Sequence, residues 1–264
     1  MDQNTVRLLV FVLVLVSLAC AEALWPRKQR VIERKLRWPS NLGLSVINTV
    51  ALKFLGPITA IAAANVAHHN NYGILTLLRS DLPFWLDIII GFALLDLFIY
   101  LQHVLSHKVP LFWRFHKVHH ADRDLDVTTG IRFHPIEVLF SMLFKCGLIL
   151  LFGPLTFAVF LFEVVLNGSA MFNHANIRLP LWLDRILRKI IVTPDMHRVH
   201  HSIIQTETDS NYGFFLSIWD QACNTYSAQP QNGHDEMIIG LKEYQTNAPA
   251  KLSWSLTVPF VRKP

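Results

Sequence analysis

The sequence predicts an all-α fold: a multi-pass bundle of about four to five transmembrane helices with a histidine-rich helical cap facing the cytoplasm. Of its 264 residues, 52% are hydrophobic and 16% are charged, which is too apolar for an ordinary soluble domain. The apolar residues gather in long runs near the length that crosses a bilayer. Its 13 histidines are concentrated in clusters, most of them beside those runs.

The formal net charge of +5 does not indicate a nucleic-acid partner, because the basic residues stand beside apolar runs, where Lys and Arg mark the cytoplasmic side. Cys20, Cys146 and Cys223 lack metal or redox spacing, so no disulfide framework is expected. We expect one integral-membrane domain over 1–264. Its parts are N-terminal spans in 1–83, a histidine-box core in 84–226 and a tail in 227–264.

Val6 to Leu24 is the first predicted span, an apolar run led by Arg7. Its last residues are mostly small, as at the cleavage site of a secretory signal peptide. However, six basic residues between Arg27 and Arg37 follow it directly, and such a cluster resists translocation and marks the cytoplasmic side. We therefore expect an uncleaved span with the amino terminus outside.

Asn41 to Ala67 is the second predicted span, kinked at Gly56-Pro57 because proline removes a helical hydrogen bond. His68 and His69 then fall in a loop on the far side of the membrane. Phe84 to Leu101 is the third span, about 27 Å long at about 1.5 Å per residue.

The third span delivers His103 and His107 to the cytoplasmic surface. Asp96 lies on the same helical face, and an ionisable group at this depth usually faces a bundle interior, a cavity or a partner. Asp96 is therefore a candidate for polar support or pocket lining beneath a metal site. A structural hydrogen bond between helices is the alternative.

Pro110 ends this helix, and Leu111 to His120 begins another. The polar stretch from Ala121 to Thr129 is expected in the cytoplasm, chiefly as solvated surface. Some of its carboxylates are candidates to accept hydrogen bonds from metal-bound imidazoles.

Ile136 to Phe172 is expected to form a helical hairpin that turns at Gly153-Pro154, because each limb is about 26 Å long. A re-entrant hairpin is the alternative. Lys145 and Glu163 lie equally far from Pro154 along the chain, so we expect them at one depth. An ion pair there would lower the energetic penalty of burying both charges.

Leu179 to Ile191 mixes apolar and basic residues as an amphipathic interfacial helix does. Thr193-Pro194-Asp195 is expected to open the next helix. Further on, Phe214 to Leu216 is expected to cap the cytoplasmic lobe or touch lipid, and His234 is expected at the surface.

Three histidine clusters have helical spacing, in which residues at i, i+3 and i+4 share a face, so each triplet is expected to present its imidazoles to one point. Imidazole is the commonest protein ligand of transition metals. A zinc ion takes about four ligands, so eight histidines suggest two metal ions. The clusters are His103-x-x-x-His107, His116-x-x-His119-His120 and His197-x-x-His200-His201.

These boxes resemble those of the fatty acid hydroxylase and sterol desaturase superfamily of integral-membrane di-iron oxidoreductases. The resemblance covers about Leu86 to Tyr226. Within it, Asp220 to Tyr226 departs from the family's usual Asp-Arg-Leu-Phe-Gly-Thr-Tyr, which leaves the geometry of that turn open. The neighbouring stretches that match are Arg132 to Glu137, Asn173 to Asn176, Thr193 to His197, and Asn211 to Gly213 leading to Ser217 to Asp220.

The resemblance implies His174 as a further metal ligand and offers His134 as another candidate. It implies two non-haem iron ions and dioxygen, used to hydroxylate or desaturate C–H bonds of a lipid, either a fatty acyl chain or a sterol-like molecule. Because no haem or flavin segment is visible, it also implies a separate electron donor, such as a ferredoxin or a cytochrome b5-type protein with its reductase. The expected partners are the bilayer, the lipid and this donor.

From the residues alone, imidazole ligands would also suit zinc or manganese. A zinc-dependent membrane hydrolase, or a metal-binding or transport protein, is therefore the second interpretation. A hydrolase is expected to carry a carboxylate base placed as in His-Glu-x-x-His, which none of the boxes contains. A transporter is expected to hold its ligands near the bilayer midplane.

Overall fold

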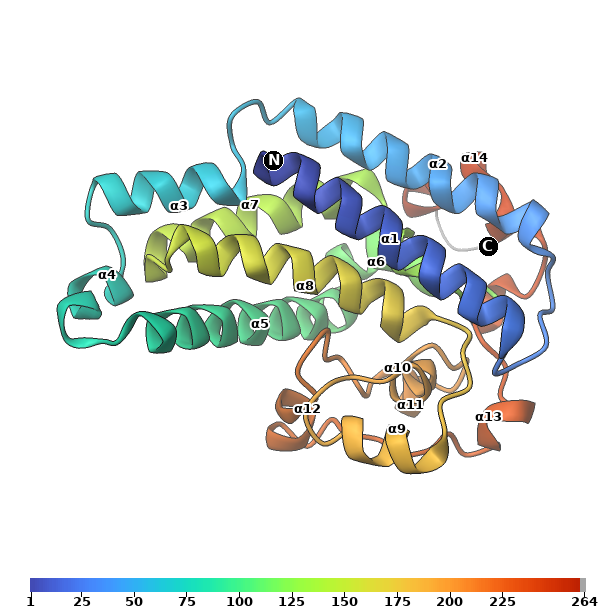
Figure 1. Ribbon diagram of the computed structural model, residues 1–264. Helices are drawn as coiled ribbons and strands as arrows, with labels where there is room; N and C mark the ends of the chain where they lie inside the picture. The colour runs from blue at the N-terminus through green and yellow to red at the C-terminus, as the bar shows by residue number, and fades with distance from the viewer. Residues whose placement is uncertain (262–264) are drawn as a thin grey trace.

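The computed structural model describes residues 1–261, which form helices and loops with only isolated β-bridges. Figure 1 shows long helices lying along one another beside a lobe of short helices that includes α9 to α13. The helices that lie along one another are α1 (Gln3–Leu24), α2 (Arg34–Lys53), α3 (Ala60–His69), α5 (Phe84–Lys108), α7 (Pro135–Phe152) and α8 (Thr156–His174). The other α-helices are α4 (Ile74–Leu78), α6 (Pro110–His120), α9 (Leu181–Leu187), α10 (Pro194–His200), α11 (Gln205–Thr208), α12 (Ile218–Ala222), α13 (Gly233–Glu236) and α14 (Leu252–Thr257).

Four of the helices within residues 1–261 are long and apolar enough to cross a membrane: α1, α5, α7 and α8. They carry large exposed apolar side chains, such as Leu13, Ile89 and Leu151, which a lipid phase would cover. The predicted all-α, multi-pass bundle is confirmed.

The prediction of one kinked span from Asn41 to Ala67 is wrong. The chain forms two helices there, α2 and α3, which are separated by residues 54–59. Among the described helices, neither α2 nor α3 has the length and apolarity of a membrane span. The reason for α2 is that it buries polar side chains, Arg37 and Asn48 among them, instead of presenting an apolar surface.

The hairpin of α7 and α8 turns where it was predicted to turn (Figure 1). Gly153 ends α7 with a left-handed φ of 64°, and its carbonyl accepts a hydrogen bond from Arg79 at 2.7 Å. A Cβ on this glycine would lie 2.3 Å from the carbonyl oxygen of Tyr72, so the turn packs too closely for a side chain. Lys145 and Glu163 pair across the hairpin at 2.8 Å, which confirms that prediction.

The stretch from Ala121 to Thr129 is not the solvated surface that was expected. Asp122 and Asp126 are buried, and Arg37 of α2 pairs with them at 2.7 and 2.6 Å. Burial alone would raise the pKa of Asp122, but the facing guanidinium and its hydrogen bonds lower that pKa to about 2. Arg37 was interpreted as one of the topology signals, yet it also joins α2 to the cap through a buried ion-pair network.

Three further expectations need correction. The amphipathic helix predicted over Leu179 to Ile191 is shorter, and Arg188 is buried and paired with an aspartate of α9 instead of snorkelling. His234 is buried near Asp195 instead of lying at the surface. The pair predicted in a loop, His68-His69, forms the exposed last turn of α3.

Candidate metal centre

Nine of the ten histidines proposed as ligands come together in two groups, and within each group one ligand nitrogen from every ring lies within 4.8 Å of the others. All nine are buried except one, which is half-buried. The first group is His103, His107, His116, His120 and His200, and the second is His119, His174, His197 and His201.

Four helices supply these side chains: the last two turns of α5, the second half of α6, the last residue of α8, and α10 with the residue after it. Pro110 stands at the start of α6 and Pro194 at the start of α10, where a missing N–H does no harm. The hydroxyl of Thr193 caps α10 by accepting a hydrogen bond from Met196 N. The position of Pro194 in the opening turn was predicted, whereas Pro110 was predicted to end the preceding helix and is instead the first residue of α6.

Each triplet is divided between the two groups instead of converging on one point. On α6, the first and last histidines join the first group and His119 joins the second. On α10, the first and last join the second group and His200 joins the first. At 3.6 residues per turn, positions i+3 and i+4 lie about 60° and 40° to opposite sides of position i, so the three rings diverge across two adjacent sites.

The hydrogen bonds of the rings indicate where a cation belongs. His103, His200, His119 and His174 each donate from Nδ1 to a backbone carbonyl oxygen at 2.6–3.2 Å. Since a carbonyl can only accept, Nδ1 carries the proton and Nε2 presents a lone pair. Yet Nε2 of His103 lies 3.1 Å from Nε2 of His200, and Nε2 of His119 lies 3.0 Å from Nε2 of His174. Facing lone pairs repel unless a cation binds them.

The protonation states agree with metal binding. Burial, followed by the neighbouring imidazoles, lowers the pKa of His119, His120, His197 and His201 well below 6.5, and burial lowers the pKa of His200 to about 3. These rings are therefore neutral at pH 7, the form that binds a metal. In addition, neither ring nitrogen of His120 has a hydrogen-bond partner among the described residues, although the ring is buried.

Glu137 is a functional candidate that the sequence interpretation missed. Its Oε1 lies 2.6 Å from Nδ1 of His116, and its Oε2 is buried without a hydrogen-bond partner among the described residues. A carboxylate in this position fixes the tautomer and orientation of a ligand imidazole and raises its basicity. Glu137 stands in a stretch that matches the family, but its spacing from the boxes gives no sign of which histidine it meets.

Two predicted site residues lie elsewhere. His134 is outside both groups. Its Nδ1 accepts a hydrogen bond from Ile136 N at 3.2 Å and so caps α7. Asp96 accepts hydrogen bonds from Leu216 N at 3.1 Å and Trp219 Nε1 at 2.8 Å, and it does not line the cavity described below. The geometry of Asp96 thus fits the structural alternative.

The turn over 220–226 is formed despite its departure from the family pattern. Asn224 stands where the family has glycine and takes a φ of 56°, a region that asparagine tolerates better than most residues. Asp220 accepts hydrogen bonds from Tyr212 N and Gly213 N, both at 2.8 Å, and burial raises its pKa to about 6. The turn therefore holds the loop whose Tyr212 carbonyl orients His103.

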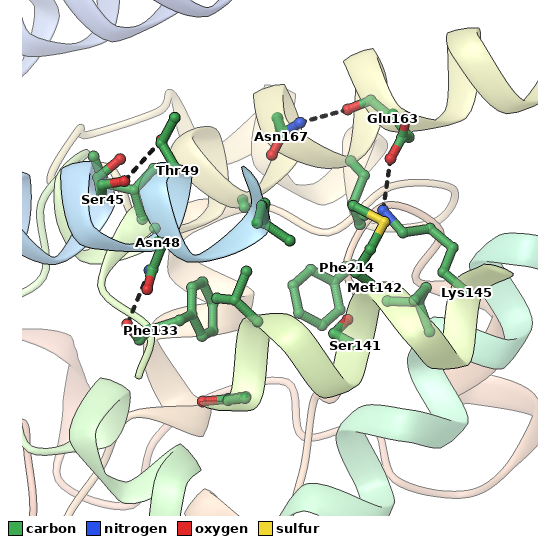
Figure 2. Close-up of a pocket in the computed structure, with 18 of the residues that line it drawn as sticks. Ser45, Asn48, Thr49, Phe133, Ser141, Met142, Lys145, Glu163, Asn167 and Phe214 are labelled. Carbon is green, nitrogen blue, oxygen red and sulfur yellow. Dashed lines mark hydrogen bonds and ion pairs between the residues drawn. The ribbon is translucent and has the colours of Figure 1, made fainter. Parts of the chain in front are cut away.

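A cavity of about 530 Å³ leads from the histidines into the space between α1, α2, α5, α7 and α8 (Figure 2). His103, His116 and Glu137 line it at the end nearest the metal centre. Phe214 was expected to cap the lobe or touch lipid, but it lines this cavity, with its ring centroid 5.0 Å from that of His103. A ligand in the cavity would therefore reach the first histidine group.

Comparison with known proteins gives a consistent result over the same region. The sequence model described as fatty acid hydroxylase matches residues 88–225. The chain is 30% identical over 194 residues to an ornithine lipid hydroxylase of Rhizobium tropici. The aligned region covers 72% of this chain and 55% of that protein. No solved structure gives a significant match.

Two further relatives are more distant. The chain is 29% identical over 158 residues to alkylglycerol monooxygenase of Homo sapiens, covering 60% of this chain and 33% of that protein. It is 23% identical over 184 residues to a very-long-chain aldehyde decarbonylase of Oryza sativa subsp. japonica, covering 61% of this chain and 27% of that protein. The chain thus spans about half the length, or less, of these relatives.

Proposed function

This chain belongs to the fatty acid hydroxylase family, and from that premise we propose that it is a membrane-bound di-iron oxidoreductase. It uses dioxygen and electrons from a separate donor to hydroxylate or desaturate a C–H bond of a lipid. The observation that carries the proposal is the pair of buried histidine groups at the end of a cavity between membrane-length helices. The lipid class is supported by the relatives, two of which are named for lipid substrates.

The proposed ligands are the nine histidines of the two groups, without His134. Five imidazoles in one group and four in the other suit two ions, and neutral nitrogen ligands suit iron. Two iron ions bound there would supply the activation of dioxygen that attack on an unactivated C–H bond requires.

The protein's own residues orient the ligand imidazoles and exclude water from the space beside them. Glu137 holds His116, and the buried carbonyl acceptors hold His103 and His200, so the ligand nitrogens are oriented before any metal arrives. Phe214 and the apolar side chains of the cavity exclude water from the space beside the first group. The apolar part of a lipid can therefore extend along these side chains toward the centre.

The cap is proposed to face the cytoplasm, where a ferredoxin or cytochrome b5-type donor would meet it. The basic segment after α1 lies on the cap, because Arg27 pairs with Asp195 at 3.0 Å and Arg37 pairs with Asp122 at 2.7 Å. Clustered basic residues stay in the cytoplasm during insertion. The whole chain is proposed to act as one integral-membrane domain.

The first test is metal content. We expect the detergent-purified chain, expressed with iron-57, to hold about two irons, since its histidines form two groups, and to show spin coupling in the oxidised Mössbauer spectrum. Lipids would then be screened with a reductase system, with mass spectrometry of the products. One tightly held zinc, with no iron after anaerobic reconstitution and no oxygen uptake, would overturn the proposal.

A further inference from the structure

Three charged side chains meet inside the cavity, away from the histidines: Arg7 of α1, Lys145 of α7 and Glu163 of α8. We call them the charged cluster. Lys145 Nζ lies 2.8 Å from Glu163 Oε1, and Arg7 pairs with the other oxygen, Oε2. Figure 2 shows Lys145 and Glu163 pointing toward each other from the two limbs of the hairpin.

The charged cluster carries two positive charges and one negative charge. Among the described residues that line the cavity, the other carboxylate is Glu137, which is engaged by His116. One positive charge is therefore left without a partner anion. Inside a membrane bundle such a charge is energetically unfavourable unless it finds a counter-ion. Nε of Arg7 is also buried without a hydrogen-bond partner among the described residues, so it is a free donor.

The charged cluster lies at a defined depth from the metal centre. On α7, Lys145 follows Glu137 by two turns, or roughly 12 Å along the helix. On α8, Glu163 precedes His174 by three turns, or roughly 16 Å. Apolar side chains such as Leu166 line the cavity between these ends. The cavity thus has a cationic end, a middle lined by apolar side chains together with polar ones such as Ser141 and Asn167, and a metal-binding end (Figure 2).

We propose that the cavity binds a lipid with an anionic head, either a carboxylate or a phosphate, which pairs with Arg7 and Lys145 while the apolar chain extends to the histidines. The planar guanidinium matches either anion through two parallel hydrogen bonds. Arg7 is 28% exposed, so the head has access beside α1. The statement that the lipid reacts at the histidine end of the cavity rests on the proposed function. The distance between the charged cluster and the histidines then determines how far from the head group the chain is oxidised.

The test is equilibrium binding to the metal-loaded full chain in detergent. The probes are palmitate, hexadecyl phosphate and neutral hexadecanol, each measured against radiolabelled palmitate. We expect at least one of the two anions to bind about tenfold or more tightly than hexadecanol, because a hydrogen bond between charged groups is stronger than one to a neutral hydroxyl; tenfold corresponds to about 1.4 kcal/mol. The tighter anion identifies the head chemistry. Equal affinities for all three probes would overturn the inference.

Variants separate charge recognition from structure. Arg7→Gln leaves the Lys145–Glu163 pair and removes the unpaired charge, so the preference for the anion should fall about tenfold while hexadecanol binding is unchanged. Glu163→Gln adds one net positive charge and should increase the preference. Lys35→Gln, at an exposed site, is the matched control and should behave as wild type. A Tm measurement identifies any misfolded variant.

A second design covers the case in which a single variant does not fold. Lys145→Arg keeps both the positive charge and a partner for Glu163, so the anion preference should persist. If Arg7→Gln weakens anionic and neutral lipids equally, or if Lys145→Arg abolishes the preference in a folded protein, the charged cluster is structural and the inference is wrong.

Binding and turnover also distinguish the two proposals. If the protein prefers the anionic lipid but oxidises no lipid with any reductant, the proposed function is wrong and this inference stands. If the protein oxidises lipids but binds anionic and neutral lipids equally, this inference is wrong and the proposed function stands.

Discussion

In the candidate metal centre, single hydrogen bonds that histidine spacing does not reveal orient the imidazole rings. His103 and His200 each donate to a carbonyl of the segment 210–212, which lies far from α5 in sequence. These bonds fix which nitrogen of each ring is free to bind a metal. Spacing alone therefore predicts which histidines gather, but it does not predict which nitrogen faces the metal.

Glu137→Gln tests the carboxylate that holds His116. The amide keeps the shape of the side chain but no longer accepts as an anion, so the imidazole loses basicity and fixed orientation. We expect metal affinity to fall about 10–100-fold. Competition with a graded series of chelators measures the affinity, and Glu33→Gln, at an exposed site, is the control. Unchanged affinity would show that Glu137 does not support the centre.

His174→Ala and His134→Ala form a matched pair. His174 belongs to the second histidine group, so its removal should reduce the metal content from about two ions to about one. His134 caps α7, so its removal should leave the metal content unchanged and lower the free energy of unfolding by about 1 kcal/mol. Elemental analysis and thermal unfolding measure the two effects. Loss of metal in His134→Ala would return that residue to the ligand set.

The gathering of most of these histidines could be predicted because i, i+3 and i+4 spacing is local information. The division of each triplet between two groups could not, since it depends on which neighbours approach from α5 and α8. Asp96 illustrates the same limit. Its position on a helical face is compatible with a pocket, and the hydrogen bonds that it accepts from Leu216 and Trp219, which fit the structural alternative, leave no signal in its spacing.

At the scale of whole helices, apolar runs predicted α1, α5, α7 and α8, and the Gly-Pro step predicted the hairpin turn. The failure was the region of α2 and α3. A run of mixed apolar residues around Gly56 reads as one kinked span, but α2 turns its polar residues inward. Arg37 finds its carboxylate partners 85 or more residues later in the chain, and such a partner leaves no local signal.

Gly153→Ala tests the hairpin turn. The substituted residue must keep a left-handed φ, which is unfavourable by roughly 1–2 kcal/mol, and its Cβ would meet the backbone of the loop before α4. We expect a clear fall in Tm. Gly147→Ala is the matched control, because a Cβ there meets nothing within 4 Å and alanine favours the helix by about 0.5–1 kcal/mol. Equal Tm values for the two variants would show that the turn tolerates a side chain.

At the scale of the whole molecule, the cap and the bundle are joined by buried charges. Glu22 near the end of α1 accepts hydrogen bonds from Val127 N and Asn176 N, and Arg37 near the start of α2 reaches Asp122 and the residues around it. Both contacts lie where the first two helices meet the cap. The basic segment between α1 and α2 therefore lies on the same side as the histidines. The positive-inside rule, applied to this one segment, predicts that the histidines face the cytoplasm.

Cysteine labelling in sealed vesicles tests this orientation. Cys223 is exposed on the cap, so in a chain with Cys20→Ala and Cys146→Ala we expect a membrane-impermeant maleimide to label it in inside-out vesicles only. A cysteine-free chain with Asn70→Cys, after the end of α3, should be labelled in right-side-out vesicles only, because α3 ends beside the hairpin turn at the opposite end of the bundle (Figure 1). The reversed pattern would place the cap outside the cytoplasm, away from a cytoplasmic electron donor. Labelling of both sites from one side would mean that the bundle does not cross the bilayer between them.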